Sequence, residues 1–585
     1  MESVKHDISK RFNLADSRPI HIALYSGKEH NYMLFEVHHI IADGASASVL
    51  MNEIDRAYNG EDIEPEDYTF YDVTAEELRL RAGSEEYEAA RLWYEQNFNI
   101  GDVDTQIIAD RNEKEAAVVH AEYNLNIDKE NIRHLIESTE VKAGTLFTSA
   151  FALLMSKFTG DEQVLFSTIW HGRSDKRMAR TMGMFVKTLP VHYAFHRGMT
   201  LAELFAHGDK IIKGARKHSV FSYADANASL GIKSNYLFVY QGYLFNNITI
   251  GGYPVTMEDL EESATTEPLS IQIYQERDGG YRAVVEYFSH LYSEALVAQL
   301  IESFEAILNS MHDGTQSIDE LSYITPRQET LLDSFNATER EYDASQTVLS
   351  YFAKHVAANP NHLAVVYKDK KYTYKEVDEL SNKIAHRINN YGLGRGDVVA
   401  VLIPRSEWMM IASLGVLKSG CGYEPLDPSY PNERLQFMTK DAGVRMIIAD
   451  KDLLSAIELD IENVLFTDDI ITLDEPTTTP NIEVRPDDLF IMLYTSGSTG
   501  VPKGCMLEHR NILSFELSHT QICGINSDSR VTAYASYGFD ASMMETYSAV
   551  VSGATLHIIA EEIRLDFVAL NEYFIKHKIT TSFMT

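Results

Sequence analysis

The sequence is poor in cysteine and in basic residues, and it lacks long apolar runs. Its three cysteines form no C-x-x-C pair, which argues against a disulfide framework or a cysteine-rich zinc site and predicts a reducing, cytoplasmic location. No stretch approaches the roughly 18 apolar residues of a spanning helix, and residues 1–20 lack the apolar segment of a secretory signal. With 51 basic and 86 acidic residues, the net charge of −35 argues against nucleic acid or a membrane surface as a partner.

The length and the composition are those of a globular protein with several domains. The 585 residues are 45% hydrophobic and 23% charged, enough to bury more than one core. A polar stretch at 311–345 contains few long apolar runs and predicts a linker with one short helix. We therefore expect a first domain at 1–310, this linker, and a second domain at 346–585.

The apolar patterns of the two halves differ. In the first half, an apolar face between Leu146 and Phe158 predicts a helix closed by Gly160. Strands are predicted in this half at 32–39, 164–170, 235–241 and 281–288. In the second half, helical and strand patterns alternate, which predicts a mostly parallel α/β sheet. Helices are predicted there at 374–391 and 408–418, and strands at 398–403, 444–449, 464–467, 490–494, 531–535, 555–559 and at the strand-like end 579–585.

The segment HHIIADG, residues 38–44, is the first candidate site. Neighbouring residues of a strand point to opposite faces, so only one of His38 and His39 can face a cleft, which argues against a shared metal. Asp43 and Gly44 predict a tight turn after the strand. A histidine fixed at such a strand end suits proton transfer near neutral pH. The alternative is a core histidine beside an ordinary turn.

With further motifs in the same order, this segment resembles the condensation domains of nonribosomal peptide synthetases, which are similar to chloramphenicol acetyltransferase. The other matches are Phe12-Asn13-Leu14 with Pro19, Tyr71-Asp72, Gly172-Arg173, Gly183-Met184-Phe185-Val186 and Thr188-Leu189-Pro190. Two residues depart from the family pattern: Lys187 stands where asparagine is usual, and His192 where arginine is common.

The resemblance implies a role for each residue of the first site. His39 would be the catalytic histidine, which deprotonates or positions the acceptor amine that attacks a donor thioester, with His38 as a supporting residue. Asp43 would be structural and ion-paired with Arg173, and Gly44 would lie beside the active-site tunnel. The two earliest family motifs are absent from the chain, so we expect an incomplete first lobe.

A second candidate site follows a predicted strand in the segment 493–504. Its glycines let backbone N–H groups approach an anion, while hydroxyl groups and a lysine add donors and positive charge. The segment has no Walker A pattern, and the alternative is a flexible serine- and glycine-rich linker. The candidate phosphate-binding residues are Thr495, Ser496, Gly497, Ser498, Thr499, Gly500 and Lys503.

This second segment resembles the phosphate loop of adenylate-forming enzymes: amino-acid adenylation domains, acyl-CoA ligases and luciferases. Supporting matches are Tyr372–Val377, Leu417–Gly420, Tyr423, Pro425–Pro428 and His509–Asn511. The resemblance covers about 346–585 and implies ATP and Mg²⁺. A substrate carboxylate would attack the α-phosphate, pyrophosphate would leave, and an acyl-adenylate would form.

The substrate is suggested by Asp540, which matches the FDxS segment of the amino-acid adenylation domains. That match implies a carboxylate that pairs with the α-ammonium of an amino acid, whereas the alternative is a helix N-cap. Ala541, Met544 and Phe583 would line the pocket for the amino acid's side chain and would favour an apolar residue such as leucine.

The sequence thus predicts an α/β protein that is part of a nonribosomal peptide synthetase cut at both ends. A chloramphenicol-acetyltransferase-like condensation domain would precede the N-terminal part of an adenylate-forming, AMP-binding fold. The aminoacyl and peptidyl carrier domains, with their phosphopantetheine, would lie outside this chain and act in cis or in trans. Two alternatives remain: an acyltransferase fused to a fatty acyl ligase, and a non-catalytic remnant or interaction module.

Overall fold

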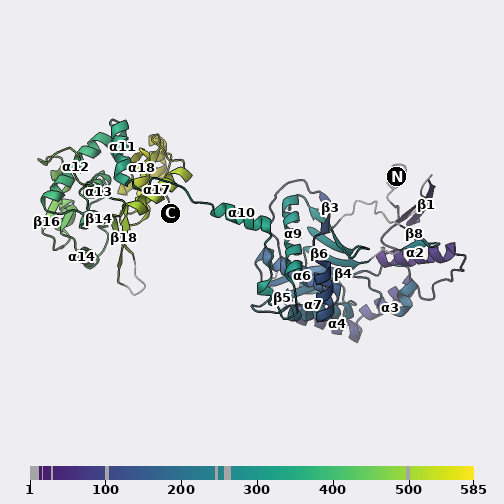
Figure 1. The fold of residues 1–585 in the computed structure, drawn as a ribbon. Coiled ribbons are helices and arrows are strands. Elements are labelled where there is room, and N and C mark those ends of the chain that lie inside the picture. The colour runs from purple at the N-terminus through teal and green to yellow at the C-terminus, as the bar shows by residue number, and fades with distance from the viewer. Residues whose placement is uncertain are drawn as a thin grey trace. The chain divides into compact units, whose positions relative to one another are not determined.

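The protein consists of two compact units, Met1–Thr338 and Glu339–Thr585 (Figure 1). The computed structural model describes residues 12–15, 18–27, 31–98, 105–243, 248–255, 265–495 and 501–584. None of the helices in these ranges is both long and apolar enough to cross a membrane. The two units are described separately below.

The first unit is built on a six-stranded sheet with the order β3-β10-β9-β6-β4-β5. Its strands are β3 (Val118–Leu125), β4 (Gln163–Trp170), β5 (Lys187–Ala194), β6 (Tyr236–Gly242), β9 (Leu269–Gln275) and β10 (Tyr281–Phe288). β6 pairs in parallel with both β4 and β9, whereas the other neighbours are antiparallel. The helices and 3-10 turns of this unit are α2 (Gly44–Tyr58), α3 (Phe70–Arg81), α4 (Glu85–Asn97), α5 (Lys129–Thr139), α6 (Ala143–Thr159), η1 (Lys176–Arg180), α7 (Leu201–Lys217), α8 (Tyr223–Leu230), α9 (Glu294–Ser310), η2 (Ile318–Glu320) and α10 (Pro326–Asn336).

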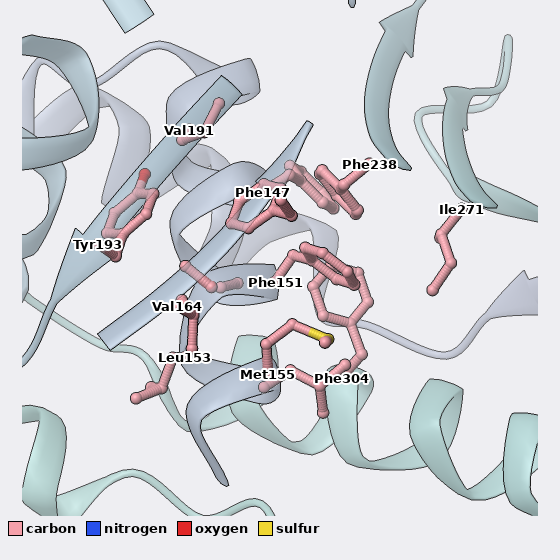
Figure 2. Close-up of a cluster of buried hydrophobic side chains, with 14 of the residues drawn as sticks. Phe147, Phe151, Leu153, Met155, Val164, Val191, Tyr193, Phe238, Ile271 and Phe304 are labelled. Atoms are coloured by element: carbon pink, nitrogen blue, oxygen red, sulfur yellow. The ribbon is translucent and has the colours of Figure 1, made fainter. Parts of the chain in front are cut away.

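Helix α6 is the centre of the core of this unit (Figure 2). Phe151 of α6 stacks on Phe238 of β6 with ring centroids 4.6 Å apart, and Phe238 meets Phe304 of α9 edge to face. Gly160 ends the helix at φ 76°, a left-handed conformation that glycine adopts without a Cβ penalty. The sequence prediction of an apolar helix closed by Gly160 is therefore confirmed.

A two-stranded antiparallel sheet leads into α2 and the first candidate site. It pairs β1 (Ile20–Ser26) with β2 (Asn31–Val37), and a second short pair joins β7 (Thr249–Ile250) to β8 (Tyr253–Pro254). The strand predicted at 32–39 ends two residues early, because the chain turns after Val37. The premise that His38 and His39 both lie on the strand is therefore wrong, because the strand ends at Val37 and both histidines follow it.

The second unit contains two sheets. The larger has the order β16-β15-β13-β14-β17-β18, parallel except for the β17–β18 hairpin, and the smaller has the order β12-β11-β20-β19. The strands are β11 (Leu363–Tyr367), β12 (Lys370–Thr373), β13 (Val398–Leu402), β14 (Gly422–Pro425), β15 (Met446–Ala449), β16 (Asn463–Phe466), β17 (Leu489–Thr495), β18 (Lys503–Glu508), β19 (Arg530–Ala533) and β20 (Thr555–Ile558). The mostly parallel sheet predicted from the alternating patterns is confirmed.

Helices cover these sheets and bury their apolar faces. They are α11 (Val348–Ala358), α12 (Tyr374–Asn390), α13 (Trp408–Lys418), α14 (Asn432–Asp441), α15 (Lys451–Ser455), α16 (Thr467–Ile470), α17 (His509–Ile522), α18 (Ala541–Ser552), α19 (Glu561–Arg564) and α20 (Phe567–His577). The strand expected at 579–585 is reduced, among the described residues, to one bridge between Val531 and Thr581. That bridge runs parallel to β19 and extends the smaller sheet by a single residue.

Candidate functional site

The first candidate site is the turn between β2 and α2, where His39 is exposed to solvent. The Nδ1 atom of His39 lies 2.8 Å from the carbonyl oxygen of Ala42. A carbonyl oxygen only accepts, so Nδ1 carries the proton and Nε2 of the neutral ring presents a lone pair. His38 is half-buried, and its Nδ1 accepts from the backbone N–H of Ile40 at 3.1 Å. Among the described residues, the Nε2 of His39 has no hydrogen-bond partner, so the turn presents this nitrogen as a candidate proton acceptor.

Asp43 holds this turn in place through its carboxylate. It is the N-cap of α2: its carboxylate accepts from the backbone N–H of Ser46 at 2.8 Å. The same carboxylate accepts from Nη1 of Arg173 at 2.9 Å and from the backbone N–H of Phe185 at 3.0 Å. The expected ion pair with Arg173 is thus present, and it joins the His39 turn to two segments more than a hundred residues away.

Arg173 completes the network around this buried carboxylate. Its Nη2 donates to Ser46 Oγ at 2.9 Å and to the carbonyl oxygen of Thr181 at 3.2 Å, and the guanidinium lies 4.8 Å from the centre of the Phe185 ring. Burial by itself raises the pKa of Asp43. The hydrogen bonds from Arg173, Phe185 and Ser46 outweigh that effect and hold the pKa below its ordinary value. Asp43 therefore remains charged and serves as a structural anion.

Two glycines allow these segments to approach each other. Gly172 has φ +70°, and a Cβ atom there would lie 1.8 Å from the carbonyl oxygen of Phe185. A Cβ on Gly183 would lie 2.4 Å from the Phe70 ring. The Gly172-Arg173 and Gly183–Val186 motifs noted in the sequence are therefore packing requirements of the network, and Gly44 opens helix α2 beside it.

The two residues that depart from the family pattern lie outside this network. Lys187 forms an ion pair with Glu77 of α3. His192 is buried in β5, where its Nε2 lies 3.1 Å from Gln163 Oε1. Burial, with His207 nearby, lowers the pKa of His192 to about 4, so this ring is neutral at physiological pH.

The second candidate site contains the hairpin between β17 and β18. Thr495 ends β17, Lys503 begins β18, and the two residues face each other across the hairpin; both are exposed. Of the predicted phosphate-binding residues, Ser496, Gly497, Ser498, Thr499 and Gly500 lie outside the described residues. The part of the hairpin that is described brings one hydroxyl and one lysine together at the carboxyl end of a buried parallel strand, where ligands of open α/β sheets bind.

The predicted amino-acid site lies after β19. Asp540 is the N-cap of α18, is exposed, and accepts from the backbone N–H of Ala541 at 2.8 Å. Ala541 and Met544 are half-buried in the first turns of the same helix. Phe583 follows the Thr581 bridge on the segment beside β19. The N-cap alternative for Asp540 is thus present, and it leaves the carboxylate open to solvent.

A hydrogen bond between the two sheets brings the ends of their strands to one region. Asp427 follows β14, the neighbour of β17, and it accepts from the hydroxyl of Ser536 in the turn that leads to Asp540. The Asp427 carboxylate also accepts from Ser429 N–H at 2.9 Å. The hydrogen bond from Ser536 to Asp427 therefore joins the turn that precedes Asp540 to the residues that follow β14, the strand next to β17.

Sequence reasoning did not identify the residues that hold these turns. Ser46 was missed: Asp43 before the helix is a typical N-cap residue, but the Ser46 hydroxyl, which accepts from Arg173 and donates to the Gly183 carbonyl oxygen, has no sequence signal of its own. Arg405 and Glu545, which bind the turn before Asp540, carry no motif of their own. Cys421, Cys505 and Cys523 are free thiols. Within the described ranges, no group of three or more His, Cys, Asp or Glu residues could hold a metal ion.

Two family models match the chain in succession. The condensation domain family matches residues 1–332, and the AMP-binding enzyme family matches residues 352–585. The first match spans more than half of the chain. Together they give the same order of domains that the motifs around His39 and Thr495 predict.

The relatives and solved structures agree with these matches. Tyrocidine synthase 2 of Brevibacillus parabrevis is 26% identical over 99% of the chain, and surfactin synthase subunit 1 of Bacillus subtilis is 26% identical over 96%. The chain spans only 17% and 16% of the lengths of those synthases. A four-domain nonribosomal peptide synthetase, solved with AMP and glycine, superposes with a TM-score of 0.76 over 99% of the chain at 18% identity, which shows that the fold is shared.

Proposed function

The chain belongs to the condensation-domain family of nonribosomal peptide synthetases, with an AMP-binding enzyme domain after the condensation domain, and from this premise we propose that it forms peptide bonds and activates an amino acid. The observation that carries the proposal is the His39 turn. Its Nδ1 is bound to the Ala42 carbonyl oxygen and its Nε2 is available as a base, on a backbone that Asp43 and Arg173 hold in place.

In the first unit, the acceptor amine attacks the carbonyl carbon of a donor thioester carried by phosphopantetheine on a carrier domain. The C–N bond forms as the C–S bond breaks. The amine proton passes to Nε2 of His39 and then to the departing thiolate, so the ring ends in its starting state. The backbone acceptor on Nδ1 keeps the same tautomer through the cycle.

In the second unit, the carboxylate of an amino acid attacks the α-phosphate of ATP, the bond to pyrophosphate breaks, and an aminoacyl-adenylate forms. Lys503 and the Thr495 hydroxyl at the hairpin would hold the phosphates, together with the predicted residues 496–500. Mg²⁺ would arrive on the ATP phosphates and neutralise them, as it commonly does in nucleotide sites. Asp540 would pair with the α-ammonium group, and Ala541, Met544 and Phe583 would border the side chain of an apolar amino acid.

Activity of the full-length protein tests both halves. His39→Ala is expected to lower peptide-bond formation by about 10²- to 10⁴-fold, the range of a general base, and to leave amino-acid-dependent ATP–pyrophosphate exchange unchanged. Asp540→Ala should show the reverse: weaker exchange, and normal condensation when the carrier domains are loaded beforehand. His134→Ala, at an exposed position of α5, is the control.

The outcomes distinguish this proposal from its competitors. Peptide formation at the wild-type rate by His39→Ala would contradict the role of His39. Exchange that depends on fatty acids and not on amino acids would favour an acyltransferase fused to a fatty acyl ligase. Absence of both activities in the wild-type protein would favour a non-catalytic interaction module.

A further inference from the structure

The turn between β19 and α18 is held by charged side chains that bind its backbone. Arg405, which follows β13, donates from Nη1 to the carbonyl oxygen of Ala535 at 2.6 Å, from Nε to that of Ile559 at 2.8 Å, and from Nη2 to that of Ala533. These three bonds use all three guanidinium nitrogens. They tie the start of the turn to the end of β20.

Glu545 of α18 binds the amide side of the same turn. One of its carboxylate oxygens accepts from the backbone N–H of Tyr534 and the other from that of Ala535, both at 2.8 Å. The side chain is nearly inaccessible, with 2% of its residue surface exposed. Arg405 and Glu545 therefore satisfy the donors and acceptors of a short irregular segment that no strand or helix would satisfy.

The rest of the turn is tied down in the same manner up to Asp540. Ser536 donates to Asp427, the hydroxyl of Tyr537 donates to the carbonyl oxygen of Met409 at 3.0 Å, and Ser542 donates to that of Tyr537 at 3.1 Å. Among the described residues, the Asp540 carboxylate accepts one hydrogen bond, from the N–H of the next residue. The position of its carboxylate is thus set by the path of the backbone before it.

We propose that Arg405 and Glu545 are positioning residues that set the Asp540 carboxylate at the distance from the substrate that recognition of an α-amino group requires. This inference rests on the proposed adenylation of an amino acid. Arg405 acts through its fixed fork of donors, which a lysine cannot reproduce. Glu545 acts through two acceptor oxygens, one of which becomes an NH₂ donor in glutamine. Small displacements of a group that orients a substrate cost large factors in rate or affinity.

The test compares Arg405→Lys and Glu545→Gln with the wild-type full-length protein in ATP–pyrophosphate exchange. In each variant the KM for the amino acid should rise about 10-fold or more, the KM for ATP should change less than about 3-fold, and the preference for the amino acid over its deamino analogue should fall. Arg387→Lys is the matched control, because Arg387 of α12 forms a partly buried pair with Glu475 in the same unit. A purely structural defect would lower the active fraction and leave both KM values unchanged.

Amide hydrogen exchange gives a second readout that does not depend on activity. Peptides covering 534–541 should exchange at least about 10-fold faster in both variants, while peptides of α13 keep their protection. If Arg405→Lys fails to fold, Glu545→Gln tests the amide side alone. A loosened turn with an unchanged KM for the amino acid would overturn the inference, and so would unchanged protection. Wild-type protein without amino-acid-dependent exchange would overturn the proposed function, and the role assigned here with it.

Discussion

The two units hold their candidate reactive turns with a nearly buried arginine, but they use it differently. Arg173 donates directly to the carboxylate of Asp43, which caps the helix after His39. Arg405 donates to three carbonyl oxygens, its Nε stays 4.0 Å from Glu561, and Glu545 binds the amides of the same segment. In the first unit the Asp43–Arg173 ion pair fixes the turn. In the second unit Arg405 binds the carbonyl groups of the turn and Glu545 binds its N–H groups.

Buried carboxyl groups show what this difference does to charge. Burial by itself favours a higher pKa for each of the carboxyl groups of Asp43, Glu545 and Glu424. Asp43 receives donors from Arg173, Phe185 and Ser46, and its pKa lies below the ordinary value. Glu545 receives two backbone N–H groups, and burial raises its pKa to about 7. Neither oxygen of Glu424 on β14 has a hydrogen-bond partner among the described residues; burial, with Asp441 nearby, raises its pKa to about 8. The ionisation state follows the donors supplied and not burial alone.

The largest effect is expected where the direct pair is broken. Arg173→Gln leaves Asp43 buried without its cation, so we expect the first unit to lose about 3–5 kcal/mol of unfolding free energy. Urea denaturation followed by tryptophan fluorescence measures it in a Trp408→Phe background, because Trp93 and Trp170 then report the first unit alone. Arg133→Gln, at an exposed pair with Glu130, should cost less than about 0.5 kcal/mol. Equal losses in the two variants would show that the buried Asp43–Arg173 pair stabilises the fold no more than an exposed pair does.

Raising the pH is expected to change the unfolding free energies of the two units in opposite directions. The pKa of Asp43 is depressed by folding, so its contribution is present above its unfolded value of 3.8 and is lost as the pH falls. The pKa of Glu424 is raised by folding, so its contribution is complete below 4.5 and is lost as the pH rises toward about 8. Glu516 of α17, with a pKa raised by burial to about 7, acts in the same direction as Glu424.

From pH 5 to 7.5 the second unit should therefore lose about 3 kcal/mol through Glu424. A Trp93→Phe/Trp170→Phe background measures it, because Trp408 of α13 then reports the second unit. Glu424→Gln should reduce the loss of unfolding free energy between pH 5 and 7.5 in the second unit. The stability of the first unit should not change. If the pH dependence of the second unit's unfolding free energy is the same in this variant, Glu424 is solvated or paired in solution.

The fold could be predicted from the sequence where one pattern decides an element. Helix α13 at Trp408–Lys418 and strand β10 at Tyr281–Phe288 lie where their apolar patterns predict them. The strand before His39 could not be bounded, because the turn is set by the Asp43 carboxylate and by Arg173 rather than by local propensity. The role of Arg405 could not be predicted for a related reason. It binds backbone carbonyl groups more than a hundred residues away, and every residue has such a group, so no sequence pattern marks them.

A small effect is expected at Lys187, which forms an ion pair with Glu77 and lies two residues after Phe185, close in sequence to the Asp43 network. Lys187 and Glu77 are 24% and 31% exposed, and their pair has none of the backbone donors that surround Asp43. Lys187→Asn, the residue that is usual in the family, should cost less than about 1 kcal/mol and leave condensation unchanged. A double-mutant cycle with Glu77→Gln isolates the coupling, which should fall well below that of Asp43→Asn with Arg173→Gln. Coupling of equal size would mean that proximity of opposite charges, rather than burial with several donors, holds the His39 turn.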